Sequence, residues 1–356
     1  MVLVPLAVIS AGYLSIILRV GAQTNVLKER ASHGLGVDLA MTVDVYRRYV
    51  VHLLFPMRLS PDYHVGPVPS PFGGARGLMI LASVALAVAL VVWLVTRIRR
   101  DGDPRWSTTL FWVAWFFAAL LPVSQIAPIY NRMADRYLLF PSIGFTTLAA
   151  YWGYLAWRRW RSRWLLAVAW IAVLALAGLT VRQVRFWDNS ERLWERATAM
   201  QPRATRGWYQ LSTTYLAQKR YEDEGRALEQ ALRNDPENAD ALNNMGINLH
   251  RRGAPIEEVA SIYSRLFVEV PGHWQGMQNY GNALIGAERY DDAILWLQRS
   301  LSLQPRYCLA MLNLGRAYKG NGDAQNARLH LEQSLVCNPN LRAARRLLHE
   351  LNDSGL

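Results

Sequence analysis

The sequence predicts an all-α protein in two parts, a polytopic bundle of transmembrane helices followed by a solenoid of short helical repeats. Long apolar runs fill the first half up to about Val181, whereas the second half reads as charged amphipathic helices in which prolines recur at regular intervals. With 52% hydrophobic and only 19% charged residues over 356 positions, the chain is too apolar for an ordinary soluble domain. The boundary between the two parts is therefore placed near residue 182.

Several apolar runs are long enough to cross a hydrocarbon core, which takes about 20 residues. They are residues 3–20, 77–95, 108–126, 138–157 and 164–181. The first run could instead be a secretory signal, but no Lys or Arg precedes it and no clear small-x-small cleavage site follows. We expect a retained span, and hence about five crossings in a transmembrane region covering residues 1–181.

Arginines lie in two short loops, one between the second and third runs and one between the fourth and fifth. These are Arg97, Arg99, Arg100 and Arg105, and then Arg158, Arg159, Arg161 and Arg163. The positive-inside rule places both loops in the cytoplasm. An odd number of crossings then puts residues 21–76, the loop 127–137 and the whole repeat half on the non-cytoplasmic side. Because these clusters account for much of the formal charge of +12, we do not expect a nucleic-acid partner.

The outer loop 21–76 contains an amphipathic stretch that is too short to span a bilayer. In Thr42–Leu54, polar Asp44, Arg47, Arg48 and His52 interrupt an apolar face at near-helical spacing. Such a helix is expected to lie along the membrane interface. The Pro- and Gly-rich segment that follows it predicts an irregular loop.

Prolines at 202, 236, 271, 305 and 339 recur at intervals of 34 or 35 residues, the period of tetratricopeptide (TPR) repeats. The predicted fold is therefore a polytopic transmembrane helix bundle followed by a TPR α-solenoid. Its parts are a linker and half-repeat helix at 182–204, repeats at 205–238, 239–273, 274–307 and 308–341, and a capping helix at 342–356. Within each full repeat one position holds a small residue, Ser212, Gly246, Gly281 or Gly315, where the two helices of the repeat should touch.

The concave face of such a solenoid is usually its binding surface, and here it predicts a protein or peptide partner. Its lining residues would be Tyr209, Thr213, Asn243, His250, Gln278, Asn282, Leu312 and Arg316. A plain solvated face is the alternative. Asn244, Asn279 and Asn313 occupy one position in successive repeats, and we expect them to bond to neighbouring backbone rather than to a ligand.

No phosphate-binding glycine loop, Ser-His-Asp order or metal-spaced histidine cluster occurs in the sequence, so no metal site is expected and the cofactor stays unknown. Polar residues at the outer membrane surface remain, above all the segment 131–137 with Arg132 and Arg136. Two guanidinium groups beside a bilayer can bind a lipid phosphate bidentately. In the alternative interpretation Arg136 pairs with Asp135 and both only flank a helix.

Four segments together resemble the transmembrane-and-TPR protein O-mannosyltransferases and their bacterial relatives, members of the GT-C glycosyltransferase superfamily. They are Leu53-Leu54-Phe55-Pro56 with Leu59-Ser60-Pro61-Asp62-Tyr63, Leu121-Pro122-Val123-Ser124, Ala134-Asp135-Arg136-Tyr137 running on to Phe145, and Phe186-Trp187-Asp188-Asn189-Ser190. The resemblance extends over nearly the whole chain but only over the C-terminal half of such a protein.

The resemblance implies sugar transfer, possibly of mannose, from a polyprenyl-phosphate donor to a protein hydroxyl on the non-cytoplasmic face. The donor phosphate is then expected at Arg132 and Arg136, with Asp135 orienting Arg136 and with Tyr137, Asp62 and Tyr63 nearby. Family members carry more spans and place their catalytic acid in the first outer loop. Nothing here matches that loop, so the catalytic N-terminal half is expected to be missing and the catalytic residues stay unknown.

Two further readings remain open beside a glycosyltransferase or its C-terminal portion. One is a non-catalytic, membrane-anchored TPR scaffold for protein–protein interaction, and the other is a truncated gene product without activity of its own.

The two cysteines, Cys308 and Cys337, would lie at adjacent ends of antiparallel helices in the last full repeat. An oxidising outer compartment would allow a disulfide between them, and two buried free thiols are the alternative.

Overall fold

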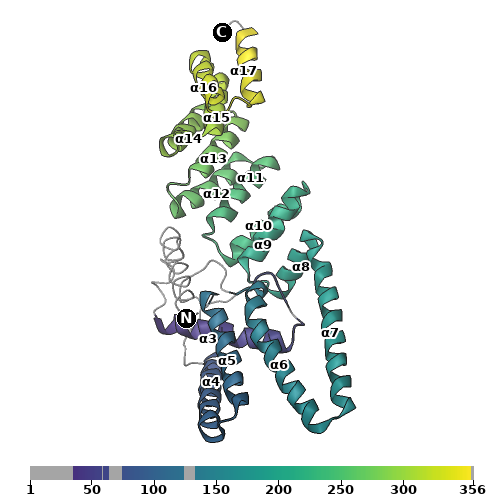
Figure 1. Cartoon of the computed structure of the whole chain (residues 1–356). Helices are drawn as coiled ribbons and strands as arrows, with labels where there is room; N and C mark the ends of the chain where they lie inside the picture. The colour runs from purple at the N-terminus through teal and green to yellow at the C-terminus, as the bar shows by residue number, and fades with distance from the viewer. Residues whose placement is uncertain (1–34, 58, 64–73, 124–132, 354–356) are drawn as a thin grey trace. The chain divides into compact units, whose positions relative to one another are not determined.

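The computed structural model describes residues 35–57, 59–63, 74–123 and 133–353, and every regular element in these ranges is helical (Figure 1). The chain divides into two compact units, Met1–Ala204 and Thr205–Leu356. The boundary expected near residue 182 falls inside the first unit, and the second unit begins at residue 205, where the sequence places its first full repeat. The expected span at 3–20 and Arg132 lie outside the described residues.

The described part of the first unit contains five long helices, one shorter helix and two 3₁₀ turns. They are α3 (Leu35–Leu54), α4 (Gly74–Asp101), α5 (Pro104–Leu120), η1 (Leu121–Val123), η2 (Asp135–Leu138), α6 (Leu139–Trp160), α7 (Arg163–Trp187) and α8 (Ser190–Met200). Local sequence fixes several of their ends. Asp103 caps α5 by accepting a hydrogen bond from the Arg105 backbone N–H at 2.8 Å, with Pro104 in the first turn, and Asn189 caps α8 in the same way.

Three stretches of helix are long and apolar enough to cross a membrane, namely Gly74–Asp101, Pro104–Val123 and Arg163–Trp187. The expected spans at 77–95 and 164–181 lie within the first and third of these, and most of 108–126 lies within the second. The fourth expected span, 138–157, coincides with α6, which is not among the three. Thr, Gly and aromatic residues between Leu139 and Trp160 make this helix less apolar than the other candidates.

Helices α3, α5 and η2 share an apolar cluster, and α3 runs across α4 and α5 in Figure 1. Its buried members include Tyr49 of α3, Leu120 of α5 and Leu138 of η2. Gly144 allows α6 to approach α5 closely, because a Cβ atom there would lie 2.9 Å from the Trp115 ring and 3.0 Å from the Trp112 carbonyl oxygen. The α3 helix is longer than the amphipathic stretch 42–54, since it begins at Leu35.

The second unit is a stack of antiparallel helix pairs in chain order (Figure 1). The pairs are α9 (Thr205–Ala217) with α10 (Tyr221–Asn234), α11 (Ala239–Arg251) with α12 (Ile256–Glu269), α13 (Trp274–Gly286) with α14 (Tyr290–Leu303), and α15 (Cys308–Gly320) with α16 (Ala324–Cys337), followed by α17 (Arg342–Asp353). The all-α, TPR-type solenoid predicted from the proline period is therefore present.

Small residues permit the close contact of the two helices within the second, third and fourth repeats, as the sequence predicts. A Cβ atom at Gly246 would lie 2.6 Å from the Tyr263 ring, and one at Gly281 would lie 2.6 Å from Leu297 Cγ. At Gly315 the same atom would lie 2.7 Å from Leu331 Cγ. Any larger side chain at these positions would push the paired helices apart.

The C-terminal end of the solenoid is closed by α17 and by a covalent bond. Ala344 and Leu351 of α17 join Leu331 of α16 in one buried cluster. Cys308 at the start of α15 and Cys337 at the end of α16 form a disulfide with a Cα–Cα separation of 5.5 Å.

Candidate functional site

One face of α3 carries a buried carboxylate held by three arginines. Asp44 is fully buried and accepts hydrogen bonds from Arg47 Nη2 at 2.7 Å, Arg48 Nε at 3.0 Å and Arg76 Nη2 at 2.9 Å. Burial raises the pKa of Asp44, but the hydrogen bonds and charges of these arginines outweigh it and hold the pKa below its ordinary value. The carboxylate is thus ionised, and it fixes three guanidinium groups around one point.

A second carboxylate, Asp135, joins the start of η2 to the segment that follows α3. Its Oδ2 accepts a hydrogen bond from the Ser60 backbone N–H at 2.8 Å, and its Oδ1 accepts one from the Tyr63 hydroxyl at 2.9 Å. His52 Nδ1 lies 3.5 Å from the same Oδ1. Burial, and then the neighbouring Asp135 charge, raise the pKa of Tyr63, so this hydroxyl stays protonated and remains a donor.

Three other residues expected at a lipid phosphate, Asp62, Arg136 and Tyr137, are among the described residues near Asp135. Asp62 is buried, and its carbonyl oxygen accepts a hydrogen bond from Ser60 Oγ at 2.8 Å. Arg136 lies over the ring of Tyr137, with 5.1 Å between its guanidinium carbon and the ring centroid. The oxygens of Asp135 therefore bond to Ser60 and Tyr63, and the expected orienting contact to Arg136 is not among the described bonds of Asp135.

An arginine-lined pocket of about 710 Å³ opens beside the polar face of α3. The described residues that line it, hereafter the arginine pocket, are Arg47, Arg48, His52, Met57, Tyr63, Arg182, Arg196, Ala199, Met200 and Gln201. Arg196 donates a hydrogen bond to Gln183 Oε1 at 3.0 Å and lies 3.9 Å from the centroid of the Phe186 ring. Arginines from α3, α7 and α8 thus line the arginine pocket together, and no carboxylate is among its described lining residues.

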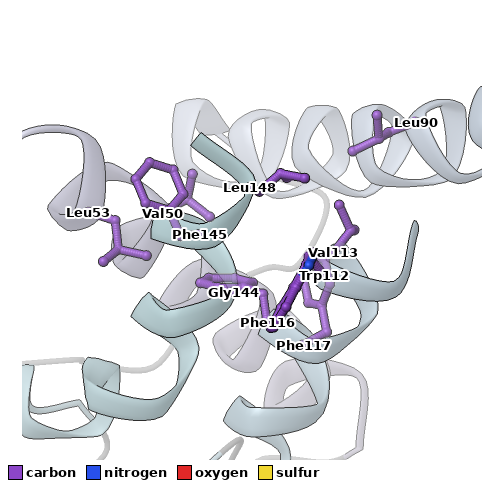
Figure 2. A pocket seen from close by; sticks show the side chains of 10 residues that line it. All are labelled: Val50, Leu53, Leu90, Trp112, Val113, Phe116, Phe117, Gly144, Phe145 and Leu148. Atoms are coloured by element: carbon purple, nitrogen blue, oxygen red, sulfur yellow. The ribbon is translucent and has the colours of Figure 1, made fainter. Parts of the chain in front are cut away.

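A separate pocket on the apolar side of α3 has a volume of about 230 Å³ (Figure 2). Val50 and Leu53 reach it from α3, and Val50 lies nearly half a helical turn away from Arg48 and His52. The remaining lining residues come from α4, α5 and α6, and they are Leu90, Trp112, Val113, Phe116, Phe117, Gly144, Phe145 and Leu148. With no charged group in its described lining, this pocket suits a hydrocarbon chain.

The first helices of the TPR repeats are linked by a ladder of side-chain hydrogen bonds. Asn244 Nδ2 donates to the Tyr209 hydroxyl at 3.2 Å, and Asn279 Nδ2 donates to Asn243 Oδ1 at 3.0 Å. In the last two repeats Arg316 Nη1 donates to Asn282 Oδ1 at 2.8 Å and to Asn313 Oδ1 at 3.0 Å. The sequence predicted backbone partners for the repeated asparagines, whereas the structure joins Asn244, Asn279 and Asn313 to side chains.

Four further residues predicted on the concave face differ in their surroundings. Thr213 bonds to the Gln210 carbonyl oxygen of its own helix, and Gln278 accepts a hydrogen bond from the Tyr307 hydroxyl at 3.1 Å. Burial, together with the charges of Arg251 and Arg316, lowers the pKa of His250. Leu312 is only 7% exposed and shares a cluster with residues of α17, so it belongs to the capped end of the core.

The arginine pocket was not predicted from the sequence as a site. Arg47, Arg48 and His52 stand out by their spacing, but Arg182 and Arg196 follow more than a hundred residues later and look like ordinary flanking charges. The only sequence signal for them is that Arg182 interrupts the end of an apolar run and Arg196 follows shortly after it.

Comparison with known proteins identifies the repeats. The family model for the tetratricopeptide repeat matches residues 176–239 and 279–342. The inactive TPR repeat-containing thioredoxin TTL3 of Arabidopsis thaliana is 32% identical over 101 residues, which are 28% of this chain and 14% of that protein. The chain therefore carries TPR repeats, and it spans only a small part of the length of that relative.

Solved TPR structures resemble the repeat half at low identity. YrrB, described as a TPR protein with an unusual peptide-binding site, is 17% identical with a TM-score of 0.40, and the match covers 47% of this chain and 86% of YrrB. PilF of Pseudomonas aeruginosa is 23% identical with a TM-score of 0.40, and the match covers 43% and 69% of the two chains. The family match shows TPR repeats, and none of these comparisons shows the O-mannosyltransferase resemblance.

Proposed function

We propose that this protein is a membrane-anchored TPR adaptor that binds an extended peptide segment of a partner protein along the concave face of its solenoid. The amide ladder carries the proposal. Asn243 of α11 and Asn279 and Asn282 of α13 present side-chain donors and acceptors in two neighbouring repeats, with Tyr209 and Arg316 near the two ends. An amide side chain can bond both to the N–H and to the C=O of an extended backbone.

The chemistry of the ladder favours a peptide over a small charged ligand. Arg316 is half-buried, and burial followed by the charge of Arg346 lowers its pKa, so an anionic group would meet one partly desolvated cation there. The remaining ladder side chains are neutral. An extended peptide would match these groups, because its backbone can bond to the neutral amides while an acidic side chain or its C-terminal carboxylate pairs with Arg316.

Membrane anchoring is supported by the three apolar helices and by the positions of the arginines. Arg99 and Arg100 lie in the last turn of α4, and Arg158 and Arg159 lie in the last turn of α6. With these ends in the cytoplasm, the topology predicted from the sequence places the solenoid on the non-cytoplasmic side.

Site-specific photocrosslinking in cells tests the adaptor function. A photoreactive amino acid at Thr213, whose hydroxyl bonds only within its own helix among the described contacts, should give a discrete crosslinked partner. The same group at Val268, a 76% exposed position on α12, is the matched control and should give none. Adding Asn243→Ala and Asn279→Ala should abolish the crosslink from Thr213. Equal crosslinking from both positions, or no effect of the two substitutions, would contradict binding at the ladder.

A glycosyltransferase is the second candidate, and one observation favours it. The two segments that carry most of the resemblance, residues 53–63 and 134–145, meet through the bonds of Asp135 to Ser60 and Tyr63. The apolar pocket on the other side of α3 would suit a polyprenyl chain (Figure 2). In this reading the chain transfers a sugar from a polyprenyl phosphate to a protein hydroxyl, and the solenoid holds the acceptor.

A transfer assay separates the two candidates. Purified protein is incubated with radiolabelled polyprenyl-phosphate mannose and the crosslinked partner, and sugar on the partner is measured. Transfer that is lost in Asp135→Ala while this variant stays folded at the assay temperature, and that is retained in Asp188→Ala, would support the enzyme. Binding of the partner without any transfer would leave the adaptor function alone.

A further inference from the structure

The arginine pocket holds more positive than negative charge. Arg47, Arg48 and Arg76 share the single carboxylate of Asp44, and Asp135 lies behind His52. Arg182 and Arg196 have no carboxylate within ion-pair distance in the part of the chain that the structure describes. The described lining residues of the arginine pocket thus include the four arginines Arg47, Arg48, Arg182 and Arg196 and no carboxylate.

Such an arrangement is unfavourable unless an anion enters it. Guanidinium groups around one hollow repel each other, and the repulsion is poorly screened where side chains are partly withdrawn from water. Arg47 and Arg48 are withdrawn in this way, with 28% and 29% of their side chains exposed. Because Asp44 fixes both on one side, their positions do not depend on a ligand being bound.

The shape of the groups selects phosphate. A guanidinium fork binds two oxygens of one phosphate, and two forks from different helices can bind it from opposite sides. Arg47 and Arg48 come from α3, Arg182 from α7 and Arg196 from α8, so three helices contribute to the arginine pocket. Met57, Ala199 and Met200 supply apolar lining next to these charges, which suits an amphipathic ligand.

The position of Arg182 on α7 indicates where the phosphate comes from. Helix α7 is a candidate span with no buried residues, and it ends at Trp187, which is 54% exposed. An exposed Trp at the end of an apolar helix marks the level of the lipid headgroups. Arg182 lies about 7.5 Å before that end at 1.5 Å per residue, within reach of the headgroup layer for a long side chain.

We propose that Arg47, Arg48, Arg182 and Arg196 form a binding site for the phosphate group of an anionic phospholipid, one that fastens the α7–α8 junction to α3. The phosphate chemistry stands on the geometry of the arginine pocket, whereas a lipid as its source rests on the membrane anchoring proposed above. None of these four arginines belongs to the predicted concave face of the TPR solenoid.

The test uses the full chain purified in a nonionic detergent. Binding of dioctanoyl phosphatidylglycerol, dioctanoyl phosphatidylcholine and inorganic phosphate is measured by thermophoresis. We expect phosphatidylglycerol to bind best and the Arg182→Gln, Arg196→Gln variant to bind it at least about tenfold more weakly, since each lost charge-assisted bond contributes on that scale. The matched control, Arg99→Gln with Arg100→Gln, removes two charges from the end of α4 and should bind like the wild type.

Each other outcome overturns a defined part of the proposal. Equal weakening in the control variant would show a diffuse charge effect and no site. Unchanged binding in the Arg182→Gln, Arg196→Gln variant would remove the pocket as the site. Inorganic phosphate binding as tightly as phosphatidylglycerol, and displacing it, would overturn the lipid as ligand while leaving a phosphate site.

A second variant that keeps both charges tests the proposal if the glutamine variant does not fold. Arg182→Lys with Arg196→Lys retains both charges but loses the forks, and it should weaken phosphatidylglycerol binding while Arg99→Lys with Arg100→Lys does not. Identical binding by the two lysine variants would contradict the proposal. Partner crosslinking from Thr213 measures the adaptor function independently of these arms.

Discussion

The Tyr63 hydroxyl donates a hydrogen bond of 2.9 Å to Asp135 Oδ1, and these two residues are 72 positions apart in the chain. The same hydroxyl accepts a hydrogen bond from the Ser60 backbone N–H at 2.8 Å. One carboxylate and one phenol therefore hold the segment after α3 against the start of η2, and they do so at the edge of the arginine pocket.

Asp135→Ala should destabilise the first unit more than Tyr63→Phe. The alanine removes this acceptor from both the Ser60 N–H and the Tyr63 hydroxyl. A buried donor that is left without an acceptor lowers the free energy of unfolding by about 1–3 kcal/mol. Thermal unfolding in detergent, followed by tryptophan fluorescence, gives the comparison, with the exposed Asp188→Ala as control. A double-mutant cycle should show coupling of at least about 0.5 kcal/mol, and strict additivity would deny the bond any role.

Glu224→Gln should stabilise the TPR unit at neutral pH. Burial raises the pKa of Glu224, and the Asn248 hydrogen bond and the Arg251 charge offset this only in part. The protonated acid is therefore favoured on folding, so wild-type stability is highest below the ordinary pKa of 4.5 and falls as pH rises through the raised value. A glutamine Nε2 could also donate to Asn248 Oδ1, a buried acceptor without a partner among the described residues.

Urea unfolding of residues 205–356 at pH 4 and pH 7 measures this effect. The variant should show a smaller loss of stability between the two pH values than the wild type. Glu229→Gln, on the exposed side of the same helix, should follow the wild type. A variant that is less stable than wild type at pH 7 would mean that the Arg251 ion pair outweighs burial.

Tyr263→Phe should stabilise the second repeat. The Tyr263 ring is fully buried against Gly246, and its hydroxyl has no hydrogen-bond partner in the described structure. Removing an unsatisfied buried hydroxyl recovers up to about 1–3 kcal/mol. Tyr318→Phe is the control, because that hydroxyl accepts a bond from Gln298 at 3.0 Å and its loss should be neutral or slightly destabilising. A lower urea midpoint for Tyr263→Phe would indicate a bound water at the hydroxyl.

Replacing Cys308 and Cys337 by serine should lower the stability of the TPR unit. The bond closes a loop with a sequence separation of 29, for which chain entropy gives an upper bound of about 3–4 kcal/mol. Urea unfolding of the wild type should have a higher midpoint than the variant without reductant. With reductant, the midpoint of the wild type should fall to that of the variant. Two reactive thiols in unreduced, denatured protein would show that the bond does not form in cells.

A topology reporter fused after Leu356 should be silent if it is active only in the cytoplasm. In the proposed topology the arginines that end α4 and α6 lie in the cytoplasm, and α7 would then carry the solenoid to the other side of the membrane. A second fusion within the loop Gly102–Asp103, between α4 and α5, is the control and should be active. Strong activity from the C-terminal fusion would reverse the assignment.

Local patterns in the sequence predicted the repeats well, because the residues that define a repeat lie close together in the sequence. Prolines at a fixed period and Gly281 or Gly315 at one helix position define a helix pair without reference to distant residues. The site residues depend on long-range packing instead. Arg182 and Arg47 come together through tertiary structure, and Leu312 is buried only because α17 packs over its place on the concave face.

The Cys308–Cys337 bond also determines how the C-terminal end would respond to a pull on Leu356, such as a partner or a translocation machine could exert. Tension would first peel α17 away, since its contacts to α15 and α16 are noncovalent. On reaching Cys337, the force would pass directly through the sulfur atoms to Cys308 and bypass residues 309–336. The helix pair α15–α16 would therefore stay folded while shielded from the load, and unravelling beyond it would have to start in α14.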